Sequence, residues 1–352
     1  MKAVVATLAL TFLLAAGPNS ACAQAQIQNL SDELSAGQHP GIEAMVVHRQ
    51  GRVLATAVSS AIDDELPDLR SVTKSITALL VGIALDQGSL GSVEQPIAEL
   101  LPAYAKAFSG DPRKARITIA DLLTMRSGLA CDDWNPKSPG HEDKMYRKRD
   151  WVRFWISQPM VGEPGSQFSY CTGNAIALGL ILKQATGRSV AEFAADELFT
   201  PLGIRSARWQ LWNRGREIDS GGHLHLHPES LARIGDLVGG AGRAGDRQLV
   251  SSRWIDQMTQ AHTPIPGRQQ SYGYLWWLDQ TTRPELPRTR ILMAWGNGGS
   301  FLIVMPELQA SVVFIGTRYN RPEALEPMLW LRDRILPAWA PQGTSTPVNQ
   351  GR

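Results

Sequence analysis

Residues 69–87, with the sequence LRSVTKSITALLVGIALDQ, join a polar start to a long apolar run. The apolar residues recur at intervals of three and four, the spacing of one buried face of an α-helix; they are Val72, Ile76, Leu79, Leu80, Ile83 and Ala84. Gly88 follows and favours a helix end there. The segment therefore predicts a buried helix over residues 71–87, with a serine and a lysine in its first turn.

Ser71 and Lys74 are three positions apart, so on a helix they share one face, with about 5–6 Å between their β-carbons. Partial burial and the positive end of the helix dipole both disfavour the ammonium form of a lysine there. A neutral lysine can take the proton of a serine hydroxyl and so activate it as a nucleophile. The alternative is a helix-capping serine followed by a solvated lysine.

Strand patterns occur towards both ends of the chain. Residues 42–58 predict a hairpin with its turn at 48–51, and further strands are predicted over 272–278, 290–294, 300–305 and 311–317. Residues 90–260 alternate helical patterns with Pro/Gly loops, most clearly over 119–125, 175–186, 189–198, 228–238 and 251–259; a last helix is predicted over 322–336. This order favours an α+β fold, in which an antiparallel sheet is flanked by helices and a large helical lobe is inserted.

We expect one domain over residues 24–340. An α/β lobe would combine about 24–88 with 262–340, and a helical lobe would span about 89–261, with a cleft between them as the natural place for a site. The polar residues 341–352 predict a flexible tail.

Residues 1–23 have the features of a secretory signal peptide: a positive start at Lys2, an apolar stretch, and the small-residue cleavage pattern Ala21-Cys22-Ala23. An uncleaved N-terminal anchor and a lipoprotein signal on Cys22 are the alternatives. Cleavage predicts a periplasmic or secreted protein without a stable membrane span. In such an oxidising compartment Cys131 and Cys171 would form a disulfide, the alternative being two buried thiols.

Composition excludes several other classes of protein. The 352 residues include 35 Lys+Arg and 33 Asp+Glu, for a net charge of +2, and 43% are hydrophobic. These values are ordinary for a globular protein and argue against a disordered, collagenous or coiled-coil chain. The balanced charge also argues against nucleic acid as a partner.

Several segments, in order along residues 42–318, match one known pattern. They are SVTKSI at 71–76, ITIADLLTMRSGL at 117–129, PGSQFSY at 164–170, the helix and loop at 174–187 and 201–204, and GNGGS at 296–300. In this order the segments resemble the motifs of the serine β-lactamase and penicillin-binding-protein superfamily. The branches they are most similar to are the class C β-lactamase-like esterases and the amide hydrolases related to 6-aminohexanoate-dimer hydrolase.

This resemblance implies catalytic roles. Ser71 matches the acylated nucleophile, Lys74 its proton acceptor, and Tyr170 the residue that moves a proton between nucleophile, leaving group and water. A phenol beside a cation can act in this way, although an ordinary core tyrosine is the alternative.

The loop at 296–300 matches the third motif of the superfamily. We expect Asn297, Gly298 and Gly299 to bind substrate there, with an oxyanion hole formed by the backbone N–H groups of Ser71 and Asn297. A plain hairpin turn is the alternative.

The sequence also departs from the superfamily pattern. Thr172 stands where class C enzymes carry an asparagine, although Asn174 could supply an amide. The third motif has no lysine or histidine, and Trp295 or Asn297 occupies its place. Loss of that cation weakens recognition of a carboxylate, which favours an esterase or amidase acting on an uncharged or hydrophobic acyl group. Paired tryptophans at 151/155, 209/212 and 276/277 fit an aromatic cleft nearly as well as an ordinary core.

Two other patterns are given ordinary interpretations. His223, His225 and His227 alternate along one extended segment, but no acidic or cysteine cluster accompanies them, so a solvated strand is expected rather than a metal site. Asp132 and Asp133 are expected to lie in a solvated loop or to cap a helix.

The sequence therefore predicts an exported serine hydrolase that cleaves a small ester or amide through a Ser71 acyl-enzyme, with no metal or organic cofactor. One alternative is a peptidoglycan D-Ala peptidase or a weak β-lactamase. The other is a non-catalytic scaffold with a penicillin-binding-like fold. The pattern carries no prediction of the oligomeric state.

Overall fold

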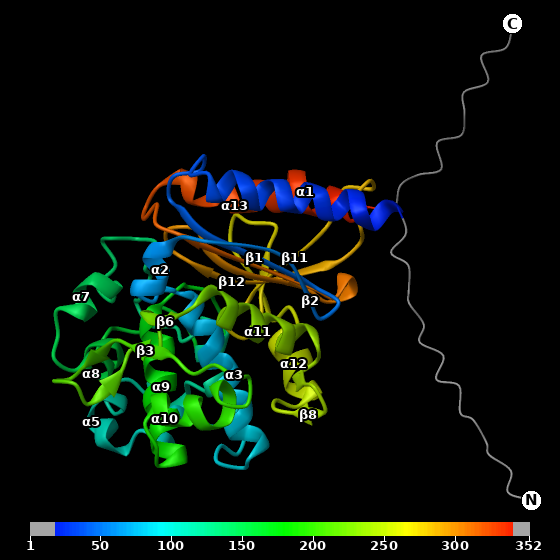
Figure 1. Cartoon of the computed structure of the whole chain (residues 1–352). Helices are drawn as coiled ribbons and strands as arrows, with labels where there is room; N and C mark the ends of the chain where they lie inside the picture. Colours follow the sequence, from blue (N-terminus) through cyan, green and yellow to red (C-terminus); the bar gives the residue numbers. More distant parts are fainter. Residues whose placement is uncertain (1–17, 341–352) are drawn as a thin grey trace, which may run out of the picture.

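The computed structural model in Figure 1 describes residues 18–340. The predicted signal peptide lies outside the described residues up to residue 17, and residues 18–23 form the first part of helix α1 (Pro18–Ser35). The predicted tail at 341–352 also lies outside the described residues.

Within residues 18–340, one antiparallel sheet of eight strands forms the centre of the fold, in the order β2-β1-β14-β13-β12-β11-β10-β9. The strands are β1 (Ile42–Arg49), β2 (Arg52–Val58), β9 (Thr263–Pro264), β10 (Ser271–Tyr272), β11 (Trp277–Gln280), β12 (Arg290–Gly296), β13 (Ser300–Met305) and β14 (Ala310–Gly316). Every residue of β13 and β14 is buried. Their nearly continuous apolar sequences suit strands that are covered on both faces.

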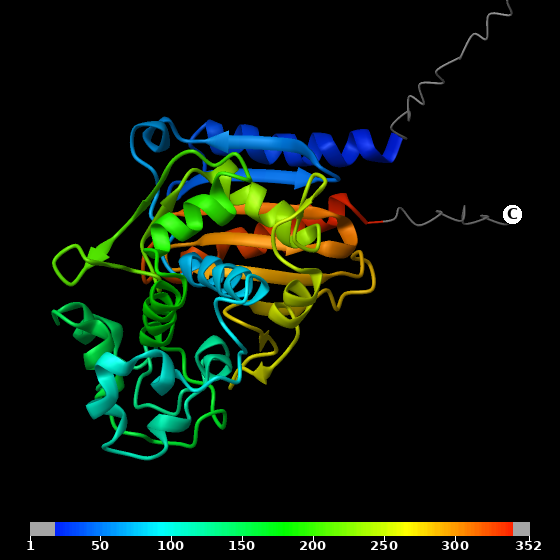
Figure 2. The same ribbon diagram turned by 90° about the horizontal axis from the view of Figure 1, so that it is seen from below.

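Helices cover the two faces of the sheet (Figure 1). Helices α1, α13 (Glu326–Trp330) and α14 (Leu336–Ala338), with the π-helix η6 (Leu331–Ile335), lie on one face. Helices α3 (Val72–Asp86) and α11 (Pro228–Gly239) lie on the other, as Figure 2 shows from below. Helix α11 falls within the predicted helical lobe, yet it packs against β1, β13 and β14.

The segment between β2 and β9 is mostly helical. Its helices, besides α3 and α11, are α2 (Ser60–Asp64), α4 (Ile97–Leu100), α5 (Ala105–Phe108), α6 (Ile119–Leu123), α7 (Glu142–Tyr146), α8 (Trp151–Ile156), α9 (Thr172–Thr186), α10 (Val190–Ala194) and α12 (Ser252–Met258), and the 3-10 turns η1 (Pro102–Tyr104) and η2 (Lys114–Arg116) and the π-helix η3 (Ala195–Phe199) connect them. Short strand pairs join β3 (Ala207–Trp209) to β6 (Leu224–Leu226), β4 (Leu211–Trp212) to β5 (Glu217–Ile218), and β7 (Arg243–Ala244) to β8 (Arg247–Gln248). The α+β arrangement with an inserted helical region is the one predicted from the sequence.

Most predicted elements are present, and the differences have local causes. The strand predicted over 272–278 is two strands, because residues 273–276 turn the chain, with Leu275 at a φ of 58°. The helix predicted over 322–336 is broken into α13, η6, α14 and the 3-10 turn η5 (Pro322–Leu325), in a segment that contains three prolines. The turn of the first hairpin is shorter than predicted, since Gln50 and Gly51 alone connect β1 to β2 with φ of 52° and 71°.

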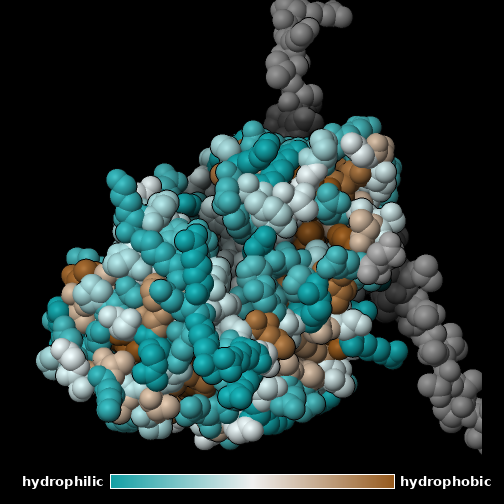
Figure 3. Space-filling view, turned by 90° about the vertical axis from the view of Figure 1, so that its left-hand side faces the viewer, coloured by the Kyte–Doolittle hydropathy of each residue, from teal (hydrophilic) through white to brown (hydrophobic). Residues whose placement is uncertain are grey.

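Helix α1 has no counterpart among the predicted elements. Its buried residues Ile27, Leu30 and Leu34 lie at helical spacing and pack against the sheet. None of the helices described here combines the length and the hydropathy needed to cross a bilayer. On the face drawn in Figure 3, hydrophobic residues are scattered among hydrophilic ones rather than gathered in one patch.

Candidate active site

Ser71 is positioned by the turn that starts α3. The backbone N–H of Arg70 donates to Oδ1 of Asp68 at 2.8 Å, and Arg70 has a φ of 51°, a conformation that costs energy for a non-glycine residue. Its guanidinium lies over the ring of Tyr319, 4.6 Å from the centroid. Ser71 occupies the N-cap position, but its side chain makes no capping hydrogen bond. The capping interpretation of this serine is therefore wrong, and its hydroxyl is available for chemistry.

Lys74 lies beneath Ser71 and is only 1% exposed. Its ammonium group donates to Oγ of Ser71 at 2.9 Å and to the carbonyl oxygen of Gly221. The carbonyl belongs to a turn distant in sequence, in which Oδ1 of Asp219 accepts hydrogen bonds from the N–H groups of Gly221 and Gly222. The solvated lysine that was the alternative from the sequence is therefore wrong.

Tyr170 joins the same group from the residues just before helix α9. It is buried, lines the same cavity as Ser71, and its ring centroid lies 5.2 Å from Nζ of Lys74. The starts of two helices thus bring together the hydroxyl, amine and phenol that the sequence singled out.

Three carboxyl groups surround Lys74, and the sequence pointed to none of them as part of the site; they belong to Asp133, Glu142 and Asp219. Asp133 was expected in a solvated loop or as a helix cap. Its Oδ2 accepts from the N–H of Thr172 at 2.6 Å and its Oδ1 accepts from the N–H of Glu142 at 2.9 Å, the first residues of α9 and α7, so the helix-cap expectation is confirmed. Asp133 also lines a cavity with Ser71. The solvated-loop interpretation of Asp133 is wrong because the chain folds this loop back against the start of α9.

These acids oppose the effect of burial on the pKa of Lys74. Burial acts to lower the pKa of the ammonium group, as predicted, but the negative charges of Tyr170 and of the three carboxyl groups act in the opposite direction and raise its pKa overall. This direction favours the ammonium form of Lys74, whereas the sequence predicted a neutral lysine.

Burial also raises the pKa values of the neighbouring groups. It raises the pKa of Tyr170, although Lys74 and the hydrogen bond from Ser71 oppose the change. It raises the pKa of Asp133 to about 7, with the Glu142 carboxylate adding to the effect, and that of Asp219 to about 6. The site therefore surrounds Lys74 with three acidic groups, Tyr170, Asp133 and Asp219, whose pKa values are raised.

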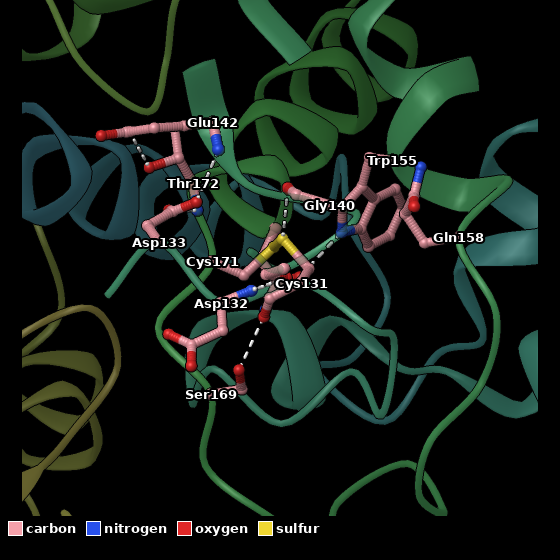
Figure 4. The surroundings of a disulfide bond; sticks show 12 residues. Cys131, Asp132, Asp133, Gly140, Glu142, Trp155, Gln158, Ser169, Cys171 and Thr172 are labelled. Atoms are coloured by element: carbon pink, nitrogen blue, oxygen red, sulfur yellow. Dashed lines mark hydrogen bonds between the residues drawn. A yellow bond between two sulfur atoms is a disulfide. The ribbon is translucent and has the colours of Figure 1, made fainter. Parts of the chain in front are cut away.

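A disulfide bond between Cys131 and Cys171 holds two of these segments together (Figure 4). The Cα atoms are 5.4 Å apart, and the bond joins residues 40 positions apart in the sequence. Ser169 Oγ donates to the carbonyl oxygen of Cys131 at 2.6 Å, and the N–H of Asp133 donates to that of Tyr170 at 2.8 Å. The predicted disulfide is therefore present in the structure. It joins the segment that carries Asp133 to the segment that carries Tyr170.

The loop at 297–299 approaches Ser71 through the end of β12. A side chain at Gly296 would collide with the carbonyl oxygen of Leu69, and Gly298 and Gly299 have φ of 94° and 97°. Within the described residues, the backbone N–H groups of Ser71 and Asn297 donate to no acceptor. Two free N–H groups are what the predicted oxyanion hole requires.

The amide groups near the site differ from the pattern of class C enzymes. Asn174 is fully buried, accepts from Nε1 of Trp155 at 3.0 Å and contacts the sulfur of Met125, so the suggestion that it supplies an amide to the site is wrong. Thr172 instead donates through Oγ1 to Glu142 Oε2 at 2.7 Å. Asn297 uses its side chain to hold Asn320, donating to its Oδ1 at 2.8 Å.

A cavity of about 350 Å³ opens above Ser71. Its wall includes three indole rings, and the full lining is Ser71, Asp133, Trp134, Glu142, Tyr170, Arg268, Trp277, Trp295, Asn297, Gly298, Asn320, Arg321, Pro322, Ala324 and Leu325. Of the tryptophan pairs noted in the sequence only Trp277 contributes, since the other five are buried elsewhere: Trp151, Trp155, Trp209, Trp212 and Trp276.

The three histidines of the extended segment have separate partners. Nδ1 of His223 lies 2.7 Å from Oδ2 of Asp68, His225 contacts the carbonyl oxygen of Leu66, and His227 caps α11. In residues 18–340 no three side chains of His, Cys, Asp or Glu gather as a group that could hold a metal ion.

Comparison with known proteins agrees with this geometry. The family described as Beta-lactamase matches residues 25–335. The 6-aminohexanoate-dimer hydrolase of Paenarthrobacter ureafaciens is 25% identical over 259 residues, which cover 67% of this chain and 64% of that protein. Penicillin-binding protein 4 of Amycolatopsis lactamdurans is 33% identical over 166 residues, which cover 46% of this chain and 39% of that one. The chain thus spans less than two thirds of the length of these relatives.

Among solved structures, EstCE1, a hydrolase with promiscuous acyltransferase activity, superimposes with a TM-score of 0.70 at 17% identity, covering 90% of this chain and 99% of that one. The β-lactamase/transpeptidase-like fold predicted from the sequence is confirmed. The family match also supports the predicted class of enzyme, a serine hydrolase.

Proposed function

The chain belongs to the β-lactamase family, and from that premise we propose that it is a serine hydrolase that cleaves a small ester or amide through an acyl-enzyme on Ser71. The observation that carries the proposal is the 2.9 Å contact between the buried Lys74 Nζ and Ser71 Oγ, because Ser71 lines a cavity together with Tyr170. A nucleophile, a cation and a proton-transfer group within reach of one another are what acyl transfer requires.

The raised pKa of Lys74 changes how the proton of Ser71 moves. As an ammonium ion, Lys74 stabilises the phenolate form of Tyr170, whose ring lies 5.2 Å from its Nζ. The phenolate takes the hydroxyl proton as Ser71 Oγ attacks the carbonyl carbon. That proton then goes to the leaving group as its bond to the carbonyl carbon breaks. In the second half of the reaction Tyr170 removes a proton from the attacking water and passes it to Ser71 Oγ as the acyl–oxygen bond breaks. Lys74 acts by its charge rather than as the proton acceptor expected from the sequence.

The free N–H groups of Ser71 and Asn297 stabilise the oxyanion that forms at each attack. Gly298 and Gly299 allow the loop to reach this position because a side chain at Gly298 would collide with Tyr319, and one at Gly299 with the backbone of Ala324.

The substrate proposed is a short ester or amide. The third motif carries Trp295 or Asn297 where the superfamily has a lysine or histidine, which argues against efficient β-lactam hydrolysis. One relative is a 6-aminohexanoate-dimer hydrolase, which acts on an amide. We propose that the protein is exported, with residues 1–23 as its signal and 24–340 as its hydrolase domain. The disulfide supports an oxidising location.

A turnover panel tests the proposal. The purified protein is assayed with p-nitrophenyl acetate and butyrate, with an ω-amino-acid dimer and with a chromogenic cephalosporin. Turnover of the esters or the dimer that is lost in Ser71→Ala supports the proposal, and Ser109→Ala on the surface is the matched control. Turnover of the cephalosporin alone would favour the β-lactamase alternative, and no turnover and no acylation by any substrate would favour a scaffold.

A further inference from the structure

Arg268 holds a position in the cavity that the catalytic chemistry does not use. It lies in the turn between β9 and β10, where its N–H donates to the carbonyl oxygen of Ile265 at 3.1 Å. Its guanidinium carbon lies 5.1 Å from the ring centroid of Trp134 and 5.4 Å from those of Trp277 and Trp295. Three rings thus hold one cation in place at the wall of the cavity.

The hydrogen-bonding capacity of this guanidinium is unused. Arg188, Arg290 and Arg334 each donate to a carboxylate at 2.6–3.2 Å. Arg268 has no carboxylate partner and donates no side-chain hydrogen bond within the described residues. A guanidinium has five N–H donors in a planar fork that matches a carboxylate. The Arg268 guanidinium contacts the indoles but no carboxylate in the described part of the chain, so its N–H groups can donate to an anion that enters the cavity.

The acidic and basic side chains that line the cavity lie in different parts of it. Asp133 and Glu142 are bound to the start of α9, through the N–H and the hydroxyl of Thr172, beside Lys74. Arg268 lies over Trp295, which with Asn297 stands near the place of the superfamily's lysine or histidine. Arg321 also lines the cavity without an ion-pair partner among the described residues. Two guanidinium groups thus line the cavity from segments outside the third motif.

We propose that Arg268, stacked on Trp134, Trp277 and Trp295, is a specificity residue that binds a carboxylate of the substrate, so that the substrates are carboxylate-bearing esters or amides. This inference rests on the proposed hydrolase function and reverses the preference for an uncharged acyl group expected from the sequence. Arg268 touches a group remote from the scissile bond and takes no part in the proton transfers.

Matched pairs of esters test this specificity. For the acyl side, mono-p-nitrophenyl glutarate is compared with p-nitrophenyl valerate. For the leaving-group side, 4-acetoxybenzoate is compared with phenyl acetate. We expect the ratio of kcat/KM, anionic over neutral, to fall by about 10- to 100-fold in Arg268→Ala for one of the pairs, the loss typical of a charge-assisted hydrogen bond. Arg268→Lys should recover only part of the ratio, since it keeps the charge but not the planar fork.

Arg247→Ala is the matched control, because it removes one exposed arginine from the β7–β8 hairpin and leaves the cavity intact. The proposal is overturned if the ratio in Arg268→Ala stays within about twofold of that in Arg247→Ala for both pairs.

A binding measurement separates this proposal from the hydrolase function. Benzoate and its neutral counterpart benzamide are titrated against the protein, with tryptophan fluorescence as the readout, since three indoles contact Arg268. Saturable quenching by benzoate that is lost in Arg268→Ala would support the anion site even if no ester were hydrolysed. Equal responses to benzoate and benzamide in wild type and variant would overturn it even in an active hydrolase.

Discussion

The two sides of the cavity are built differently. The reactive side, formed by Ser71, Lys74, Tyr170 and the acids around them, comes from the starts of helices, and its charged groups are buried against one another. The aromatic side, formed by Trp134, Trp277, Trp295 and Arg268, comes largely from turns and strand ends, and Trp134 and Arg268 are exposed.

This difference separates chemistry from recognition. On the reactive side, removing one group leaves buried partners unsatisfied, so its protonation states depend on every neighbour. On the aromatic side, Arg268 contacts only indole rings and has no hydrogen-bonded or ion-paired side chain among the residues that the structure describes, so a change there should alter what is bound without disturbing the proton transfers.

Replacing the nucleophile gives the largest effect expected on the reactive side. Ser71→Ala should reduce kcat for ester hydrolysis by about 10⁴-fold or more, because the bond-forming atom is gone. The measurement is steady-state hydrolysis of p-nitrophenyl butyrate, with circular dichroism to confirm folding. A loss smaller than tenfold would place the chemistry at another residue.

Removing the disulfide tests how far the reactive side depends on its framework. Cys131→Ser with Cys171→Ser should lower the free energy of unfolding by about 4 kcal/mol, since a loop of 40 residues is no longer closed in the unfolded chain. Denaturant titration measures this loss. Ester turnover should fall as well, because Asp133 and Tyr170 are held next to the bond; unchanged stability and turnover would show that the loops are held without it.

The buried carboxyl of Asp219 should make stability depend on pH. Its pKa of about 6 lies above the ordinary value of 3.8, so between these pH values the folded chain holds a proton that the unfolded chain has released. Stability therefore falls as pH rises through this window, by up to about 3 kcal/mol. Asp219→Asn should flatten this part of a plot of unfolding free energy against pH. The exposed control Asp246→Asn should not, and an equal slope in all three proteins would contradict the assignment.

The smallest effect expected concerns the pH dependence of the reaction. The Glu142 carboxylate raises the pKa of both Lys74 and Tyr170. Because the proposed reaction uses the phenolate of Tyr170, activity should rise with pH on the alkaline side as the Lys74–Tyr170 pair loses one proton. Glu142→Gln should move this rise to lower pH, whereas Glu99→Gln on the surface should leave it in place. The readout is kcat/KM for a neutral ester from pH 6 to about pH 10, a range that spans these groups. A shift to higher pH in Glu142→Gln would contradict the electrostatic account.

The reactive residues near one another in sequence could be predicted. Ser71 and Lys74 lie one helical turn apart in an apolar pattern that specifies the helix by itself, so their contact follows from local spacing. The strands β12 to β14 were equally clear because their apolar runs are long and bounded by turns. The pairing of Cys131 with Cys171 followed from assigning Cys22 to the predicted signal peptide, because two cysteines then remain.

The groups that decide protonation and recognition could not be predicted, because tertiary contacts create them. Asp133 looks like an ordinary loop residue until the disulfide and the start of α9 enclose it. Asp219 reaches Lys74 from more than 140 positions away in sequence. The sequence around Arg268 indicates no function, because the three tryptophans that it contacts come from separate segments of the chain.

The central claim is that the Ser71 hydroxyl is the activated nucleophile of this cavity. Its most direct test is labelling of the folded protein with a fluorophosphonate, followed by proteolysis and mass analysis of the peptides. We predict one adduct, on the peptide that contains Ser71, which is absent in Ser71→Ala and abolished by prior unfolding. An unlabelled wild-type protein, or an adduct on a different serine, would contradict the account.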